Sequence, residues 1–375
     1  MSNVQVPLDV KICRKCAVER GLKQLEYPQT CTRHPVSEED ESTSRLSEYE
    51  HYLYDELPAG DTIRLLQLAP GNGDEPIDCN LVVRSLDSDT PYTALSYTWG
   101  DPVPKHAISC NGSRFFIGEN LHSALLQFRR DDRMESLWID AMCINQRNNE
   151  EKNAQVRKMR EIYKRAAQVI CWLGEQEESD DEGFALMRKL HTQYGHLSPQ
   201  DLHSVNFKTT DQLGLPDTEN KQWKSMAKIL YRPYFFRIWI VQEIIAATRC
   251  IIQCGTHTID RASIFAIGVI FENFHFVNDA MGANIPLPQS ADPDADKDEP
   301  VISYSVQHLW ALKALIDTGE TPKIGQLLMN TRAFKATNPL DKIYALIGLC
   351  SDVSPTFIDY NKRSMKCKLT LPNFA

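Results

Sequence analysis

The amino-acid sequence predicts an α/β fold in which helices flank a parallel β-sheet. Two apolar runs, at residues 137–144 and 169–173, have the composition of strands that are covered on both faces. Between them, residues 148–168 place apolar side chains at helical spacing, with Arg and Lys on the opposite face. A strand, a helix and a strand in this short space predict a right-handed crossover between parallel strands.

Polar residues and a glycine mark the limits of these central elements. Asn148 and Glu151 have the spacing of a helix start, because a side-chain oxygen and a carboxylate can both serve free backbone amides there. Gly174 ends the second strand. Asp140 would lie in the middle of the first strand, where a buried acid needs partners, so we expect it to have a structural role.

The segments before this central unit favour strands, and those after it favour helices. Strands are expected at residues 63–68, 79–86 and 92–99, followed by a hairpin at 107–117 and a helix at 121–130. The hairpin is indicated by Asn111-Gly112, since both turn residues must accept positive φ. The later elements are expected in this order: helices at 184–190, 223–230 and 235–247, a hairpin at 249–260, an exposed flexible loop at 281–300, and a cap of helices at 304–316, 324–329 and 340–349.

The composition argues against several classes of protein. The chain has 375 residues, a formal net charge of −9 and a pI near 5.6, so it lacks the basic excess of a nucleic-acid binder. No apolar run approaches the roughly 18 residues that cross a bilayer, and no signal-peptide core is present. The 11 cysteines are expected to be mostly reduced core thiols. We therefore expect a cytoplasmic protein, with a nuclear location also open.

The N-terminal leader, residues 1–35, contains two pairs of metal-ligand residues. Cys13 and Cys16 form one pair and Cys31 and His34 the other, and the two pairs have the same spacing. This pattern predicts a tetrahedral structural zinc site. Two coincidental pairs are the alternative, whereas a redox pair lacks the βαβ context that it requires. The acidic, serine-rich segment that follows, within residues 36–60, is expected to be a solvated linker.

Three longer segments resemble one family. They are Tyr92-Thr-Ala-Leu-Ser-Tyr-Thr-Trp-Gly-Asp101, the central block from Leu137 to Gly174, and Arg232-Pro-Tyr-Phe-Phe-Arg-Ile-Trp-Ile-Val-Gln-Glu243. All three are similar to the heterokaryon incompatibility (HET) domain of fungi, and Asp341-Lys-Ile-Tyr-Ala-Leu-Ile-Gly348 resembles a segment often found just downstream.

The HET resemblance implies a domain at residues 61–255, followed by a helical C-terminal extension at residues 256–375. It also implies a fungal source and a role in non-self recognition and programmed cell death. The leader and the end of the chain at Ala375 lie outside the resemblance, and a truncated gene model would explain that end.

The order of elements also resembles that of TIR domains, which have a flavodoxin-like parallel sheet. Trp239-x-x-x-Glu243 is similar to the Trp-Cys-x-x-Glu signature of a TIR helix, although Ile240 replaces the cysteine. The insertions between Gly174 and Arg232 have no TIR counterpart. In NAD-cleaving TIR domains that glutamate is catalytic, so the resemblance implies NAD as the substrate and Glu243 as the catalytic residue. Glu243 would stabilise an oxocarbenium-like ribosyl cation as nicotinamide leaves.

A candidate substrate site follows from the predicted sheet, because open parallel sheets bind ligands at the carboxyl ends of their strands. Trp99 could stack there on a nicotinamide or adenine ring, and ribose or amide groups could bond to Asp101, Asn145 and Gln146. Trp239 completes the predicted substrate-binding set.

Structural interpretations of the same residues stay open. The tryptophans are equally typical of a core, and Asn145-Gln146 of a turn that starts a helix. Glu243 is equally typical of a helix-surface acid that pairs with Arg237 or Arg249.

Two classes of function therefore remain. In the first, the protein is a TIR-like NAD glycohydrolase that depletes NAD and triggers cell death, with self-association completing its site. In the second, it is a non-catalytic death-signalling adaptor that contacts other proteins, such as an upstream recognition protein. A zinc-assisted nucleic-acid binder is disfavoured by the acidic charge balance.

Overall fold

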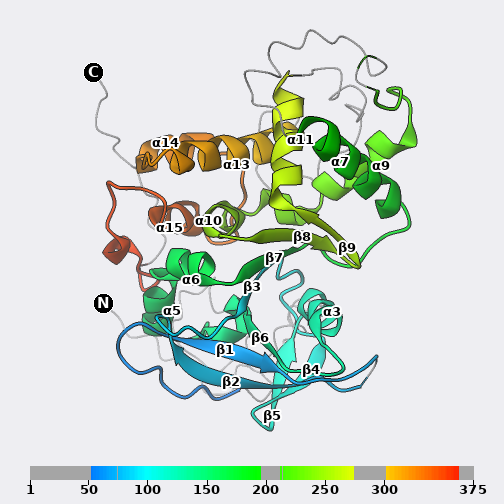
Figure 1. Cartoon of the computed structure of the whole chain (residues 1–375). Coiled ribbons are helices and arrows are strands. Elements are labelled where there is room, and N and C mark those ends of the chain that lie inside the picture. The colour runs from blue at the N-terminus through cyan, green and yellow to red at the C-terminus, as the bar shows by residue number, and fades with distance from the viewer. Residues whose placement is uncertain (1–51, 74, 196–211, 213, 274–300, 363–375) are drawn as a thin grey trace, which may run out of the picture.

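The computed structural model describes residues 52–73, 75–195, 212, 214–273 and 301–362. These residues form a mixed sheet with helices around it (Figure 1), so the predicted α/β class is confirmed. The sheet has nine strands in the part of the chain described, in the order β5-β4-β2-β1-β6-β3-β7-β8-β9. The predicted zinc leader and the loop at 281–300 lie outside the described residues, as does most of the linker at 36–60.

Four mutually parallel strands form the middle of the sheet. They are β6 (Glu135–Trp138), β3 (Thr93–Tyr97), β7 (Gln168–Trp172) and β8 (Cys250–Cys254), in that spatial order. Numbered along the chain, this order is 2-1-3-4, which is consistent with a flavodoxin-like arrangement. The strands are mostly apolar and, apart from their first residues, mostly buried, as expected where both faces of a parallel sheet are covered.

The predicted strand at 137–144 was wrong beyond Trp138. The chain turns at this point, and α4 (Asp140–Cys143) forms one helical turn whose backbone amides bond back to the carbonyl of Ile139. The Asp140 side chain accepts a hydrogen bond from the amide of Ala141 at 2.7 Å, so it supports the start of a helix rather than lying within a strand.

After α4, the crossover from β6 to β7 contains two further helices where a single helix was predicted. The predicted cap is confirmed, because the side chain of Asn148 accepts hydrogen bonds from the first amides of α5 (Asn149–Val156). The chain tightens where the amide of Lys158 bonds only three residues back, to Gln155. A second helix, α6 (Met159–Arg165), then leads to β7.

Further strands extend the sheet at both edges, and all their pairings are antiparallel except that of β2 with β4. On one side lie β1 (Thr62–Leu68), β2 (Asp78–Ser85) and the hairpin of β4 (His106–Cys110) and β5 (Ser113–Ile117). The predicted hairpin turn is confirmed, because Asn111 and Gly112 have φ values of 51° and 72°. On the other side β9 (His257–Asp260) pairs with β8 around Gly255, as predicted.

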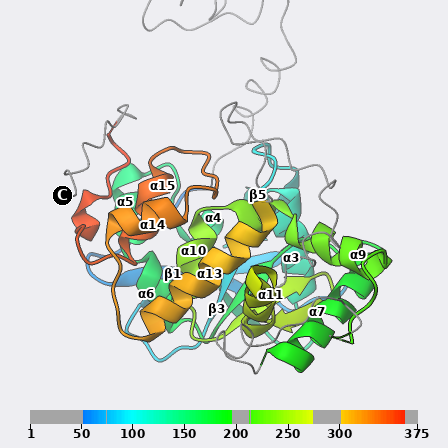
Figure 2. The same cartoon turned by 90° about the horizontal axis from the view of Figure 1, so that it is seen from above.

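The helices lie in two groups around the sheet. Beside β8 and β9 lie α7 (Asp180–Tyr194), α9 (Lys221–Leu230) and α11 (Arg261–Asn273), while α3 (Glu119–Phe128) lies near β4 (Figure 1). The C-terminal cap contains α13 (Val301–Asp317), α14 (Ile324–Asn330), α15 (Asp341–Ile347) and the short η2 (Pro355–Phe357). Seen from above, α13 runs between the α14–α15 pair and α11 (Figure 2).

The helix predicted at 235–247 begins later than expected. A 3₁₀ turn, η1 (Pro233–Phe236), comes first, and α10 spans Trp239–Ala246. Between them Arg237 is extended, and its backbone bridges to that of Lys335. This pairing explains the later start, because it uses backbone groups that a continuous helix would need for itself.

None of the described helices is long and apolar enough to span a bilayer.

Candidate functional site

A cavity of about 950 Å³ lies at the carboxyl ends of β3 and β6, where the fold predicts a ligand site. Its lining comes from the segments 97–102 and 140–147 that follow these strands, from α5, and from the start of α10. The opposite wall comes from residues 335–338, Asp341 and Tyr360. Its volume falls within the range of small-molecule sites in proteins.

All five predicted substrate-binding residues line this cavity. They are Trp99, Asp101, Asn145, Gln146 and Trp239. The structure therefore brings together residues from three separate segments of the sequence. What they bind stays a prediction.

Trp99 is held at the cavity by a polar contact. Its indole Nε1 donates to both carboxylate oxygens of Asp140, at 3.1 and 3.2 Å, while the side chain is still 45% exposed. Burial raises the pKa of the Asp140 carboxyl, and Arg237 lowers it in part. Gln146 donates to the carbonyl of Asp140 at 2.9 Å, which ties two parts of the same wall together.

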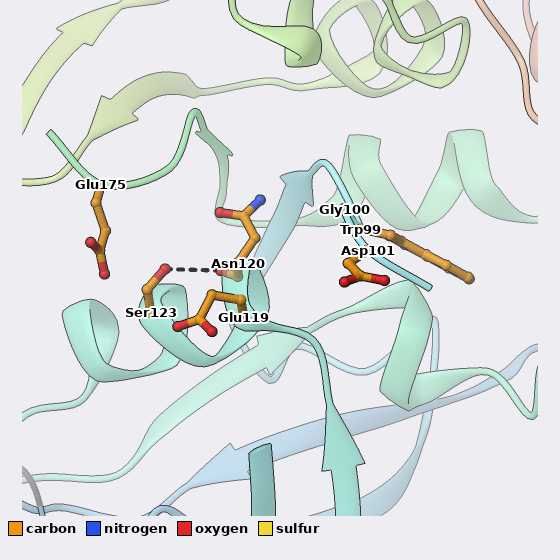
Figure 3. A pocket seen from close by; sticks show the side chains of 7 residues that line it. All are labelled: Trp99, Gly100, Asp101, Glu119, Asn120, Ser123 and Glu175. Carbon is orange, nitrogen blue, oxygen red and sulfur yellow. Dashed lines mark hydrogen bonds between the residues drawn. The ribbon is translucent and has the colours of Figure 1, made fainter. Parts of the chain in front are cut away.

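A smaller pocket of about 290 Å³ lies beside the cavity and shares Trp99, Gly100 and Asp101 with it. Figure 3 shows Glu175 and Ser123 at the end of this pocket away from Trp99, whose indole points away from them. Trp99 therefore lines both pockets, and its indole is exposed.

Glu243 lies behind the cavity rather than in its lining. Its side chain is 1% exposed and accepts a hydrogen bond from Ser96 of β3. Arg237 Nη1 lies 3.6 Å from Glu243 Oε2, and the Arg237 side chain does line the cavity. Burial raises the pKa of the Glu243 carboxyl, and Arg237 lowers it in part. Of the two structural partners weighed above, Arg237 is the one observed, but the acid is buried and not on a helix surface.

The hydroxyl of Tyr234 extends this buried network, 2.7 Å from Ser96 Oγ. Ser96 and Tyr234 were not singled out in the sequence. Arg237 was named there only as a structural partner of Glu243, not as a residue that lines the cavity.

The far wall of the cavity is tied to α10 through Asp341. One carboxylate oxygen accepts from Trp239 Nε1 at 3.1 Å, and the other accepts from the hydroxyl of Tyr360 at 2.7 Å. The ammonium group of Lys152 lies 4.2 Å from the centre of the Tyr360 ring. None of Asp341, Tyr360 and Lys152 was predicted as a site residue.

Other residues of the segment 341–348 dock α15 on its neighbours. Lys342 donates to the carbonyls of Arg332 and Phe334, and Tyr344 donates to the carbonyl of Asp359. Gly348 approaches α10 so closely that a Cβ would lie 2.3 Å from Oε1 of Gln242. The C-terminal extension is therefore a structural part of the cavity.

The predicted zinc ligands Cys13, Cys16, Cys31 and His34 lie outside the described residues.

Residues 92–243 match the family model described as heterokaryon incompatibility protein (HET). The matched stretch runs from the residue before β3 to the buried glutamate of α10. This stretch of the chain is therefore similar to HET domains. It is also 26% identical, over 355 residues, to heterokaryon incompatibility protein 6, OR allele, of Neurospora crassa, in a match that covers 83% of this chain. The chain spans about half the length of that curated relative, 51%. No solved structure matches the chain.

The HET match supplies only part of the cavity. It includes Trp99, Asp140, Arg237 and Trp239, whereas the wall formed by residues 335–341 and 360 lies beyond it. The two parts meet at the hydrogen bond between Trp239 and Asp341.

Proposed function

We propose that the chain is an effector of heterokaryon incompatibility, acting in fungal non-self recognition and cell death, and that it hydrolyses NAD. The similarities to HET domains and to the Neurospora crassa protein support the first part. The second part rests on one observation, the single cavity that gathers all five predicted substrate-binding residues at the carboxyl ends of parallel strands.

The proposed reaction breaks the bond between nicotinamide nitrogen and ribose C1′. Water adds its oxygen to C1′, neutral nicotinamide leaves with the bonding electron pair, and one proton is released to solvent together with ADP-ribose. A carboxylate near C1′ lowers the barrier, because positive charge develops on the ribosyl group before water bonds. The exposed indole of Trp99 offers a stacking surface for one of the two bases.

Glu243 is the carboxylate that we assign to this step. Because Arg237 lies between it and the cavity, the substrate has to displace the guanidinium group before the ribosyl cation can meet the carboxylate. Asp140 is the competing candidate, since it lines the cavity directly. Both have pKa values raised by burial, and either must be ionised to stabilise a cation.

The test is nicotinamide release from NAD by the purified full chain, at high protein concentration so that self-association is favoured. Glu243→Gln and Asp140→Asn keep the shape of each side chain and remove its charge. Glu161→Gln, on the outer part of α6, is the matched control because Glu161 does not line the cavity. We expect loss of at least a hundredfold for Glu243→Gln and little change for the control. Loss confined to Asp140→Asn would move the catalytic role to that residue.

A non-catalytic adaptor is the second candidate, and the burial of Glu243 in an ion pair with Arg237 favours it. In that case the cavity residues contact another copy of the chain or an upstream recognition protein. Cell death that persists in Glu243→Gln, with no nicotinamide release from the unaltered protein, would support the adaptor and contradict the enzyme.

A further inference from the structure

Charged side chains of both signs line the cavity. Its lining includes these cations and acids: Arg147, Lys152, Arg237, Lys335, Asp101, Asp140 and Asp341. The acids and the cations differ in whether they have partners within the protein.

Each of the three acids accepts hydrogen bonds within the protein. Asp140 accepts from Trp99 and from a backbone amide, and Asp341 accepts from Trp239 and a tyrosine hydroxyl. Asp101 accepts from the amide of Val103 at 3.0 Å and lies 3.5 Å from the ammonium group of a nearby lysine.

Lys152 has no such partner. Within the described part of the chain, its ammonium group has neither an ion pair nor a hydrogen bond, and it lies over the face of the Tyr360 ring. The side chain is half-buried, and it is close enough to Asp140 and Asp341 to lower the pKa of each. These acids supply negative charge nearby, but among the described residues none accepts a hydrogen bond from this ammonium group, so its N–H donors can serve an anion.

A second cation of the cavity has a free donor. Arg237 Nη1 is buried and makes no hydrogen bond within the described residues, although it faces Glu243 at 3.6 Å. Arg147 and Lys335 also line the cavity but are exposed, so solvent and salt weaken their pull on a ligand. Among the cations that line the cavity, Lys152 is therefore the one best placed to bind an anion.

We propose that Lys152 binds a phosphate group of a nucleotide whose base stacks on Trp99. The aromatic surface and the unpaired cation line the same cavity, and a ligand with a flat base and a phosphate satisfies both. Lysine is well suited to this role because it binds phosphate as a compact point charge. The choice of a dinucleotide as the ligand rests on the proposed function. The test, however, measures ligand binding and does not require hydrolysis of NAD.

The test compares ADP-ribose, which has two phosphates, with adenosine, which has none. Affinities for the full chain are measured by calorimetry for ADP-ribose and by ligand-observed NMR for adenosine. In Lys152→Gln we expect a roughly tenfold to hundredfold loss of affinity for ADP-ribose, as for one hydrogen bond to a charged group. Adenosine should bind as before, and Lys152→Arg should keep most of the affinity for ADP-ribose.

Lys164→Gln is the matched control. It also removes one positive charge, but Lys164 lies on the next helix, α6, is exposed, and does not line the cavity. Equal ADP-ribose affinity in Lys152→Gln and in the unaltered chain would overturn the proposal, as would failure of the unaltered chain to bind ADP-ribose. Loss of both ligands in Lys152→Gln would also overturn it, because Lys152 would then maintain the shape of the site. Binding that depends on Lys152 without nicotinamide release would uphold the proposal and contradict NAD hydrolysis.

Discussion

The contact between α10 and the C-terminal cap can be tested at Asp341. Its carboxylate accepts hydrogen bonds from two donors, the indole of Trp239 and the hydroxyl of Tyr360. Asp341→Asn and Asp341→Leu have similar size but differ in what they offer these donors. The first keeps an acceptor and adds a donor, and the second removes both oxygens.

The two substitutions should differ clearly in cost. In Asp341→Asn the amide oxygen can accept from Trp239, and the amide nitrogen can donate to Tyr360, because a hydroxyl also accepts whereas an indole N–H only donates. Burial raises the pKa of Asp341, so the neutral amide also avoids an unfavourable buried charge. We expect a loss of less than about 1 kcal/mol in the free energy of unfolding.

Asp341→Leu leaves both donors without an acceptor. Each unsatisfied buried group costs about 1–3 kcal/mol, but both aromatic side chains are half-buried, so water replaces part of each bond. We therefore use the low end of that range and expect a total loss of about 2 kcal/mol.

Urea unfolding followed by circular dichroism gives these free energies, and ADP-ribose binding to the same variants reports on Trp239. We expect the leucine variant to bind more weakly because its indole is no longer held at the cavity. Equal stabilities for the asparagine and leucine variants would refute the hydrogen-bond reasoning. Unchanged ligand binding in the leucine variant would show that Asp341 does not position Trp239.

Two further predictions concern buried charges. Arg232→Met should lower the free energy of unfolding by about 3–5 kcal/mol, because it leaves Asp180, 1% exposed and 2.7 Å from the guanidinium group, without its counter-charge. The exposed Arg165→Met should cost less than about 1 kcal/mol in the same urea experiment, and a similar cost for both would contradict this. For Glu243 the folded pKa is raised, so the folded chain keeps that proton to higher pH than the unfolded chain does. Its contribution to stability should fall as pH rises from the ordinary glutamate value through the raised one, and a difference between wild type and Glu243→Gln that does not change with pH would contradict the shift.

Much of the sheet could be predicted because its signals are local. The run at 169–173 ends at Gly174 and has the length and composition of a buried strand, and the Asn111-Gly112 turn favours positive φ by its own composition. The cap at Asn148 is equally local, since its side chain bonds to amides two and three residues ahead.

The errors arose where burial or distant contacts decide the backbone. Residues 139–144 are apolar whether they form a strand or a buried helical turn, and Asp140, interpreted as an interruption, was the signal of a helix start. The late start of α10 depends on a backbone bridge between Arg237 and Lys335, which lie far apart in the sequence.

In the candidate site, too, some residues could be predicted from local patterns and others depend on distant contacts. Trp99, Asn145 and Gln146 could be predicted because they follow strands whose ends meet at one edge of a sheet. The partnership of Asp341 with Tyr360 depends on how the C-terminal cap folds over α10, and no local pattern reports it.

The hydrogen bond between Trp239 and Asp341 joins the family-matched segment to the C-terminal cap, so it affects where the gene can be cut or fused. A gene fusion or an expression fragment cut at the limits of the family match, residues 92–243, would transfer the strands β3 to β7 but would cut α10 before its end at Ala246. It would omit the strand β1 that borders β6, the strand β8 that borders β7, and the wall that closes the cavity. The segment that must be kept together is therefore longer than the family match at 92–243. Chimaeras that exchange specificity between related proteins should be joined before residue 62 and after residue 360.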